Sequence, residues 1–134
     1  MLKVKASAKP SKIHGMGLFA DERIPKGTTT WKFDPAFDVV YDPAEVEKMP
    51  EQKKESIDFY AYLSNKTGKY IYSPDDSRFT NHSKNNNIDN VEMAGEVELC
   101  GVANRDIEIG EELLVNYQKL DKYSSTSKEG YLAS

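Results

Sequence analysis

Cysteine and histidine are scarce in this chain, which has one cysteine, Cys100, and two histidines, His14 and His82, among its 134 residues. A single cysteine excludes an internal disulfide bond. The three residues together are also too few for a four-ligand Cys/His zinc site, so no metal ion is expected to stabilise the fold.

The chain also has no excess of basic charge, and it has no long apolar run. The net charge is −4 and the pI is about 5.2, which argues against a nucleic-acid binder with a broad basic surface and favours cationic partners such as lysine-rich tails. The opening "MLKVKASAKPSK" lacks an apolar core of signal-peptide length, and no window approaches a membrane span. We therefore expect a soluble intracellular protein, cytoplasmic or, in a eukaryote, nuclear, without direct contacts to nucleic acid or membrane.

The apolar residues that are present follow the pattern of several short strands. With 134 residues, 38% of them apolar, the chain is long enough for one domain with one modest core. Apolar residues alternate with polar ones in five places, each bounded by glycine or proline. The strands are expected at Leu18 to Ala20, at Thr29, Trp31 and Phe33, at Tyr70 to Tyr72, at Val97, Leu99, Gly101 and Ala103, and at Leu113, Val115 and Tyr117.

Helices are indicated in two places between these strands. Asp42 can cap a helix whose first residue is Pro43, and Glu45 follows three residues after the cap, as in a capping box. Pro50 limits the length of this helix. The segment 53–63 alternates like a strand in its second half, but its first half is rich in helix-forming residues, so a helix is favoured there.

Two short patterns are less informative than they look. "GMGLFA" at 15–20 matches the glycine fingerprint of dinucleotide-binding proteins, but it has no strand before it and no helix after it, so that function is rejected. Alanine, isoleucine and glycine also recur with identical spacing in two segments. They are Ala20, Ile24 and Gly27, and then Ala103, Ile107 and Gly110. Two similar turns that each lead into a strand explain this echo, and no repeat architecture is predicted from it.

Three motifs occur in a fixed order: "HGMGLFA" near the start, "RFTNHS" at 78–83 and "ANRDIEIGEELLVNY" at 103–117. In this order they resemble the SET domain of protein lysine methyltransferases, from about Lys12 to Tyr117. The resemblance implies a mainly β fold with short helices, the β-clip arrangement of small curved sheets, with a threaded C-terminal segment that brings the second and third motifs together. It divides the chain into a lead-in (1–11), a SET domain (12–117) with a variable insert (35–75) and a polar tail (118–134).

The resemblance also implies an activity, namely methyl transfer from S-adenosylmethionine to a lysine of a basic protein, histone-like or ribosomal. Tyr117 takes the position of the catalytic tyrosine. Asn81 and His82 match residues that hold the adenine side of the cofactor, and the turn 15–17 would hold its methionine end. The predicted cofactor-binding residues are Gly15, Met16, Gly17, Arg78, Asn81, His82, Tyr117 and Tyr123. Arg78 is expected to pair with Glu111 or Glu112, and Phe79 to pack in the core.

The chain departs from the pattern after "RFTNHS". Many relatives continue with Cys-x-Pro-Asn, whereas residues 84–87 read "KNNN" and only Asn87 agrees. A cysteine-rich zinc segment after the tyrosine is absent, and either Tyr123 in the tail or a second subunit, in a homodimer, is the candidate to replace it. Val115 leaves the number of transferred methyl groups open. The alternatives are a non-catalytic peptide-binding module of the same fold and, less favoured, a methyltransferase for a small amine.

Overall fold

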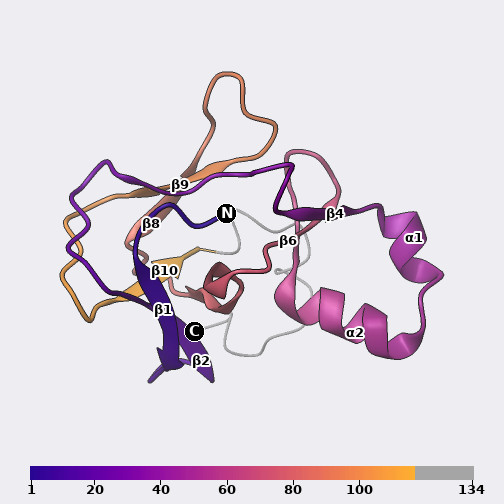
Figure 1. Ribbon diagram of the computed structural model, residues 1–134, viewed down its shortest axis with the longest axis horizontal. Helices are drawn as coiled ribbons and strands as arrows, with labels where there is room; N and C mark the ends of the chain where they lie inside the picture. Colours follow the sequence, from indigo (N-terminus) through magenta and orange to yellow (C-terminus); the bar gives the residue numbers. More distant parts are fainter. Residues whose placement is uncertain (117–134) are drawn as a thin grey trace.

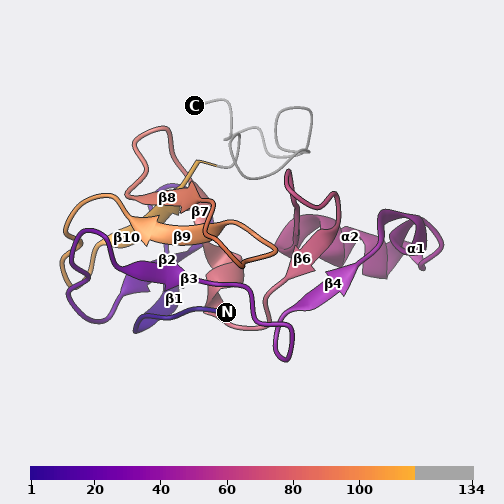
Figure 2. The same cartoon turned by 90° about the horizontal axis from the view of Figure 1, so that it is seen from above.

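The computed structural model describes residues 1–116, which form short strands in three small sheets, two α-helices and one 3-10 helix. The strands of the first two sheets lie together at one end of the molecule, and the helices lie with the third sheet at the other end (Figures 1 and 2). The fold is thus mainly β with short helices, as predicted. None of the helices in residues 1–116 is long and apolar enough to cross a membrane.

The first sheet joins the N-terminal and C-terminal motifs. Its strands, in spatial order, are β1 (Ala6–Pro10), β2 (Met16–Ala20), β10 (Glu112–Val115) and β7 (Asn81–His82). β10 runs antiparallel to β2 and parallel to β7, where Leu114 is the partner of Asn81 and Val115 the partner of His82. The second and third motifs therefore lie side by side, as the resemblance implied.

The second sheet packs on the first and encloses the main core. It contains β3 (Thr29–Trp31), β9 (Cys100–Ala103) and β8 (Ile88–Val91) in that spatial order. The buried side chains between the two sheets are aliphatic and come from two segments of the chain, 18–24 and 88–115. They are Leu18, Ala20, Ile24, Ile88, Ala103, Ile107, Leu113 and Val115.

The third sheet and both helices belong to the predicted insert. The strands are β4 (Val39–Tyr41), β6 (Tyr70–Tyr72) and β5 (Tyr62–Leu63) in spatial order, and the helices are α1 (Pro43–Glu47) and α2 (Glu51–Tyr60). Their apolar side chains form a separate cluster of buried residues, which comprises Val46, Ile57, Ala61 and Tyr70. The insert thus has a small core of its own.

Helix boundaries follow the local signals closely. The Asp42 carboxylate accepts a hydrogen bond from the Ala44 amide at 3.0 Å, and Pro43 is the first residue of α1, as predicted. The segment 53–63 is a helix in its first part, as favoured, and a strand at its end. α2 ends at Tyr60, and Tyr62 and Leu63, from the half of the segment that alternates, form β5.

The two echoing turns pair with each other by reciprocal hydrogen bonds. The Ile24 amide donates to the Ile107 carbonyl at 2.8 Å, and the Ile107 amide donates back to Ile24 at 2.8 Å. The Gly27 amide binds the Ala103 carbonyl, and the Gly110 amide binds the Ala20 carbonyl, at 2.8 and 2.9 Å. The echo therefore marks two segments related by an approximate two-fold axis, a relation that the sequence reading did not anticipate.

Two predicted strands are shorter than expected. β9 begins at Cys100, and Val97 is 58% exposed because it lies in the loop before that strand. The reason is Glu98, whose buried carboxylate accepts hydrogen bonds from the hydroxyls of Ser64 and Thr67 at 2.6 and 2.7 Å, which holds the approach to β9 away from the sheet.

Phe33 likewise lies outside β3. That strand ends at Trp31, and the next amide, Lys32, donates to the Met1 carbonyl and not to a sheet neighbour.

Candidate active site

The three motifs converge on one cavity of about 330 Å³. His14, Gly15 and Met16 border it from the turn before β2, Arg78 and Asn81 from the second motif, and Leu113 and Val115 from β10. Aromatic side chains from the insert, from β3 and from the second motif border it as well. They are Trp31, Phe59, Tyr60, Tyr62 and Phe79. None of the described residues that border the cavity is a carboxylate.

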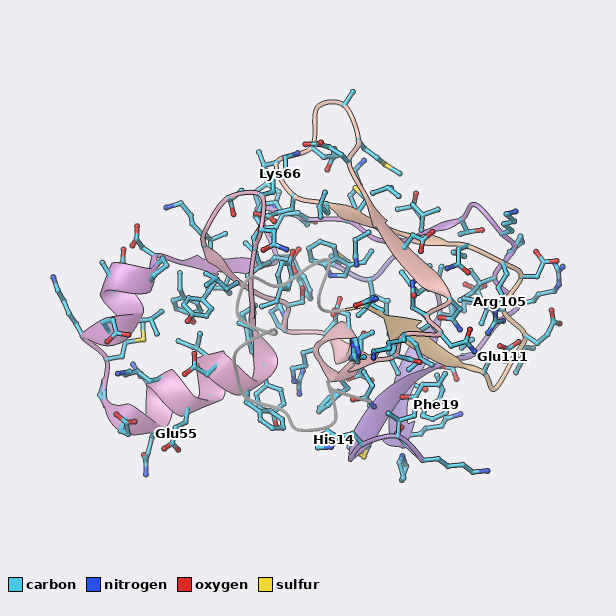
Figure 3. All side chains as sticks on the ribbon, turned by 180° about the vertical axis from the view of Figure 1, so that it is seen from behind. His14, Phe19, Glu55, Lys66, Arg105 and Glu111 are labelled. Atoms are coloured by element: carbon cyan, nitrogen blue, oxygen red, sulfur yellow. The ribbon has the colours of Figure 1, made fainter. Side chains whose placement is uncertain are left out.

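The structure places the predicted cofactor residues in three groups. Gly15, Met16, Arg78 and Asn81 border the cavity. Gly17 and His82 are buried directly beside these residues in the chain and are not among those that border the cavity. Tyr117 and Tyr123 lie outside the described residues, so their predicted roles stay predictions. His14 lies on the loop that leads into β2 (Figure 3).

The Asn81 side chain ties the three motifs together. Its amide nitrogen Nδ2 donates to the carbonyls of His14 and Met16, both at 3.0 Å, and to Glu112 Oε2 at 2.9 Å. Asn81 is only 4% exposed. Its Oδ1 accepts no hydrogen bond from the residues that the structure describes, so this oxygen stays available to a ligand.

Glu112 is a site residue whose role the sequence reading missed. Its carboxylate accepts hydrogen bonds from the Ser11 hydroxyl at 2.8 and 3.0 Å, in addition to the bond from Asn81. A Cβ atom at Gly17 would lie 2.2 Å from Glu112 Oε2. The second glycine of "GMG" thus leaves the space that this carboxylate occupies. The alternation of the strand could have indicated this role, because neighbouring residues in a strand point to opposite faces and only one of Glu111 and Glu112 can therefore point inward.

His82 is buried at the inner end of the second motif. The side chain is 2% exposed. Burial, and secondarily the nearby Lys84 charge, lowers the pKa of His82 below its ordinary value of 6.5. A neutral imidazole is therefore favoured at neutral pH, consistent with a supporting position behind the cavity.

Arg78 does not pair with Glu111 or Glu112, contrary to expectation. Its Nη1 donates to the carbonyls of Pro74 and Asp75 at 2.8 and 3.2 Å. The guanidinium carbon also lies 4.5 Å from the Phe79 ring centroid, within the range of a cation–π interaction. The reason is the 3-10 helix Asp76–Phe79, which turns the Arg78 side chain back onto the two carbonyls that precede the helix and towards the cavity.

Glu111 has a different partner on the surface. Arg105 Nη1 lies 2.9 Å from its carboxylate, and the two side chains lie next to each other at the edge of the molecule (Figure 3). The hydrogen bond from the Glu108 amide, and then that from Arg105, lowers the pKa of Glu111.

Phe79 is not a core residue, contrary to expectation. It borders the cavity and packs edge-on against Tyr60, with ring centroids 5.9 Å apart.

Asn87 explains why the last position of "KNNN" is the one that agrees with the family pattern. Its Nδ2 donates to the Glu112 carbonyl at 2.8 Å, and its Oδ1 accepts from the Leu114 amide at 2.8 Å. The Asn87 amide donates to the Leu114 carbonyl as well, at 3.1 Å. The segment after "RFTNHS" thus holds β10 through one buried asparagine, Asn87. Lys84 and Asn85 take no part in these hydrogen bonds.

A buried polar chain supports the aromatic side of the cavity. Trp31 Nε1 donates to the Ser73 hydroxyl at 3.1 Å, and that hydroxyl donates to Asp38 Oδ1 at 2.7 Å. Trp31 also meets Tyr62 edge-on, with ring centroids 6.2 Å apart. These bonds fix the Trp31 ring where it borders the cavity, and no sequence motif singled it out.

The fold of three small sheets, with glycine turn, Asn-His pair and Glu-Leu strand meeting at one apolar cavity, defines a class of protein. The family model of the SET domain matches residues 15–118. The chain therefore belongs to the SET domain family, whose members are typically protein lysine methyltransferases that use S-adenosylmethionine.

Solved structures share the fold. A chain of a humanized mutant of the Chaetomium thermophilum Polycomb Repressive Complex 2, bound to the inhibitor GSK126, matches with a TM-score of 0.66 and 24% identity, over 89% of this chain and 15% of that chain. A Plasmodium falciparum protein, named as a candidate histone methyltransferase, matches with a TM-score of 0.59 and 18% identity, over 87% of this chain and 95% of that one.

At these identities both structural matches show the fold alone. This chain spans only 15% of the length of the Chaetomium chain. A comparison with curated protein sequences finds no match.

Proposed function

We propose that this chain transfers a methyl group from S-adenosylmethionine to a lysine side chain of a basic protein, histone-like or ribosomal. The observation that carries the proposal is the single cavity on which all three motifs converge, with Met16, Asn81 and Val115 at its border. An apolar cavity with a few convergent polar groups is the usual form of a small-molecule site.

The residues at the cavity fit the cofactor. The methionine end of S-adenosylmethionine carries a carboxylate and an ammonium group, and the cavity offers a cation for the first, Arg78, and an acceptor for the second, Asn81 Oδ1. We assign Asn81 to the methionine end, and not to the adenine side as the resemblance implied, because its Nδ2 donates to the carbonyls of His14 and Met16 in the turn proposed to hold that end. Gly15 has a φ of +47° and nothing within 4 Å of where its Cβ would be, so its backbone is open to a ligand. When bound, the cofactor supplies an electrophilic methyl group on a sulfonium.

The cavity also suits an acceptor lysine that must lose its proton. A free lysine with a pKa of about 10.4 is neutral in only about one molecule in 2,500 at pH 7. The aromatic residues Trp31, Tyr60 and Tyr62 border the cavity, and an apolar surface disfavours the charged ammonium. None of the described residues that border the cavity is an anion that would counteract this effect.

Tyr117 is the proposed catalytic residue, by its position in the motif. It follows Asn116, the last residue that the structure describes, and Val115 two positions earlier borders the cavity. A tyrosine hydroxyl there would orient the amine in line with the methyl group, and such alignment supplies much of the rate in a displacement reaction.

The test is incubation of the protein with labelled S-adenosylmethionine and a histone and ribosomal-protein mixture, beside Tyr117→Phe. Tyr41→Phe is the matched control, because Tyr41 does not border the cavity. We expect label on lysine with the natural chain and with Tyr41→Phe, and its loss with Tyr117→Phe while S-adenosylhomocysteine still binds. Absence of both label and binding in the natural chain would contradict the proposal.

The proposal extends to the organisation of the chain. Residues 12–117 form the SET domain, 35–75 its insert and 118–134 a tail that supplies Tyr123 to cover the cofactor, unless a second copy of the chain does so. Truncation after Lys119 separates these possibilities. Weaker binding of S-adenosylhomocysteine supports the tail, whereas unchanged affinity that depends on protein concentration supports the homodimer.

A further inference from the structure

The two adjacent glutamates of the third motif point in opposite directions. Glu111 forms an exposed ion pair with Arg105. Glu112 points inward, and its carboxylate is bound by the Ser11 hydroxyl and by Asn81 Nδ2. Its side-chain hydrogen-bond partners within residues 1–116 are thus uncharged groups of the first and second motifs, which suggests a role beyond a surface ion pair.

The contacts of Asn81 fix the orientation of its amide. Nδ2 carries two hydrogens and lies within hydrogen-bond distance of three oxygens, those of His14, Met16 and Glu112. The flipped amide would set Oδ1 against the same three oxygens, where it could accept nothing. The carboxylate of Glu112 is the strongest of the three acceptors because it is charged.

We propose that Glu112 is a positioning residue for cofactor binding. Its carboxylate holds Nδ2 of Asn81, so that Oδ1 remains available as the acceptor for the ammonium group of S-adenosylmethionine. The inference rests on the proposed function and deepens it, since Glu112 itself does not border the cavity.

Gly17 lies against the Glu112 carboxylate and offers a second way to test its contact with Asn81. A Cβ atom at this position would lie 2.2 Å from Glu112 Oε2 and 2.8 Å from the carboxyl carbon, and Cβ atoms in folded proteins essentially never approach non-bonded atoms this closely. Alanine at position 17 must therefore displace the carboxylate from Asn81. Gly17→Ala is expected to weaken cofactor binding in the same way as loss of the Glu112 side chain.

The experiment compares Glu112→Ala, Glu112→Asp and Glu112→Gln, with Glu111→Ala as the control on the outer face of the same segment. The dissociation constant of S-adenosylhomocysteine and the KM for S-adenosylmethionine are measured at a temperature where circular dichroism shows each variant folded. Glu112→Ala and Glu112→Asp are expected to raise both about tenfold, the effect of one lost hydrogen bond to a charged group, with little change in kcat.

Glutamine should restore tight binding, because its carbonyl can accept from Asn81 and its amide can donate to the Ser11 hydroxyl. Glu111→Ala should bind like the natural chain. Equal affinity of Glu112→Asp and the natural chain would overturn the inference, as would glutamine binding as weakly as alanine. If Glu112→Ala does not fold, the affinities of the aspartate and glutamine variants still test the inference, since aspartate should bind weakly and glutamine tightly.

The outcomes separate this inference from the proposed function. If the natural chain itself fails to bind S-adenosylhomocysteine, the proposed function is wrong. If it binds the compound and transfers methyl groups while all Glu112 variants bind equally well, only the role of Glu112 is wrong.

Discussion

At the scale of single residues, buried asparagines connect the motifs in this chain. Asn81 ties the turn before β2 to Glu112, and Asn87 uses both ends of its amide on the backbone of β10. An asparagine can donate and accept at once, so one side chain can replace a pair of strand hydrogen bonds.

Asn87→Ala is expected to lower the free energy of unfolding by about 2 to 3 kcal/mol, because two partly buried backbone groups of β10 lose their partner. Urea denaturation measures the change. Asn85→Ala, at an exposed position in the same run, serves as the control and should leave the midpoint unchanged. Equal midpoints for the two variants would contradict the role given to Asn87.

His82 predicts a pH dependence of stability. The unfolded chain binds a proton on this imidazole near pH 6.5, whereas burial keeps the folded chain from doing so until lower pH. The unfolded state therefore binds more protons in this window, and the free energy of unfolding falls as the pH drops below 6.5.

Urea denaturation across this range measures the slope, and His82→Gln should flatten it. His14→Gln, which changes the other histidine, should retain the slope. A slope that is the same in all three proteins would exclude His82 as its origin.

At the scale of elements, the two echoing turns act as one paired unit. Gly27 and Gly110 occupy equivalent places and have the same φ of +89°, a conformation that other residues adopt at a cost. Each also donates its amide across the pair. The unit joins the ends of the first and second sheets.

Gly27→Ala and Gly110→Ala should each destabilise the protein, by similar amounts of about 1 kcal/mol or more. Thermal unfolding measures both, with Lys26→Ala in the same turn as the control for an exposed position. A clear effect at only one of the two glycines would show that the turns are not equivalent.

The elements show how far local sequence determines structure. Asp42 and Pro43 predicted the start of α1, since capping is a local interaction, and the alternation at 70–72 predicted β6. The start of β9 at Cys100 could not be predicted, because it depends on Glu98 and on hydroxyls about thirty residues away in the chain.

The same distinction holds for the candidate site. The motifs predicted Gly15, Met16, Arg78 and Asn81 as cofactor-binding residues; all four border the cavity, and their contact with the cofactor stays a prediction. The partners of Arg78 were predicted wrongly, because a single turn of 3-10 helix decides where its side chain points. Glu112 was missed, since its role appears only when Ser11, Gly17 and Asn81 are seen around it.

At the scale of the whole molecule, the buried apolar residues form two separate clusters with different roles. The cluster between the first two sheets supports the residues proposed to bind the cofactor, whereas the insert has its own cluster around Ile57. Figure 2 shows the two parts side by side, with the chain between β3 and β4 running from one to the other. Cofactor binding is therefore expected to depend mainly on the first cluster.

Leu113→Ala and Ile57→Ala test this division, since both side chains are buried, at 1% and 7% exposure. Each should lower the free energy of unfolding by about 2 to 5 kcal/mol. Among the folded molecules, Leu113→Ala should weaken the binding of S-adenosylhomocysteine, because Leu113 borders the cavity, and Ile57→Ala should not. Calorimetry provides the comparison, and equal losses of affinity would contradict the division.

The central claim is that the cavity where the three motifs meet serves methyl transfer to lysine. The most direct measurement is mass spectrometry of a histone and ribosomal-protein mixture after incubation with S-adenosylmethionine and either the natural chain or Tyr117→Phe. The account predicts methylated lysine with the natural chain and none with Tyr117→Phe. No methylation by the natural chain, or the same methylation by both proteins, would contradict it.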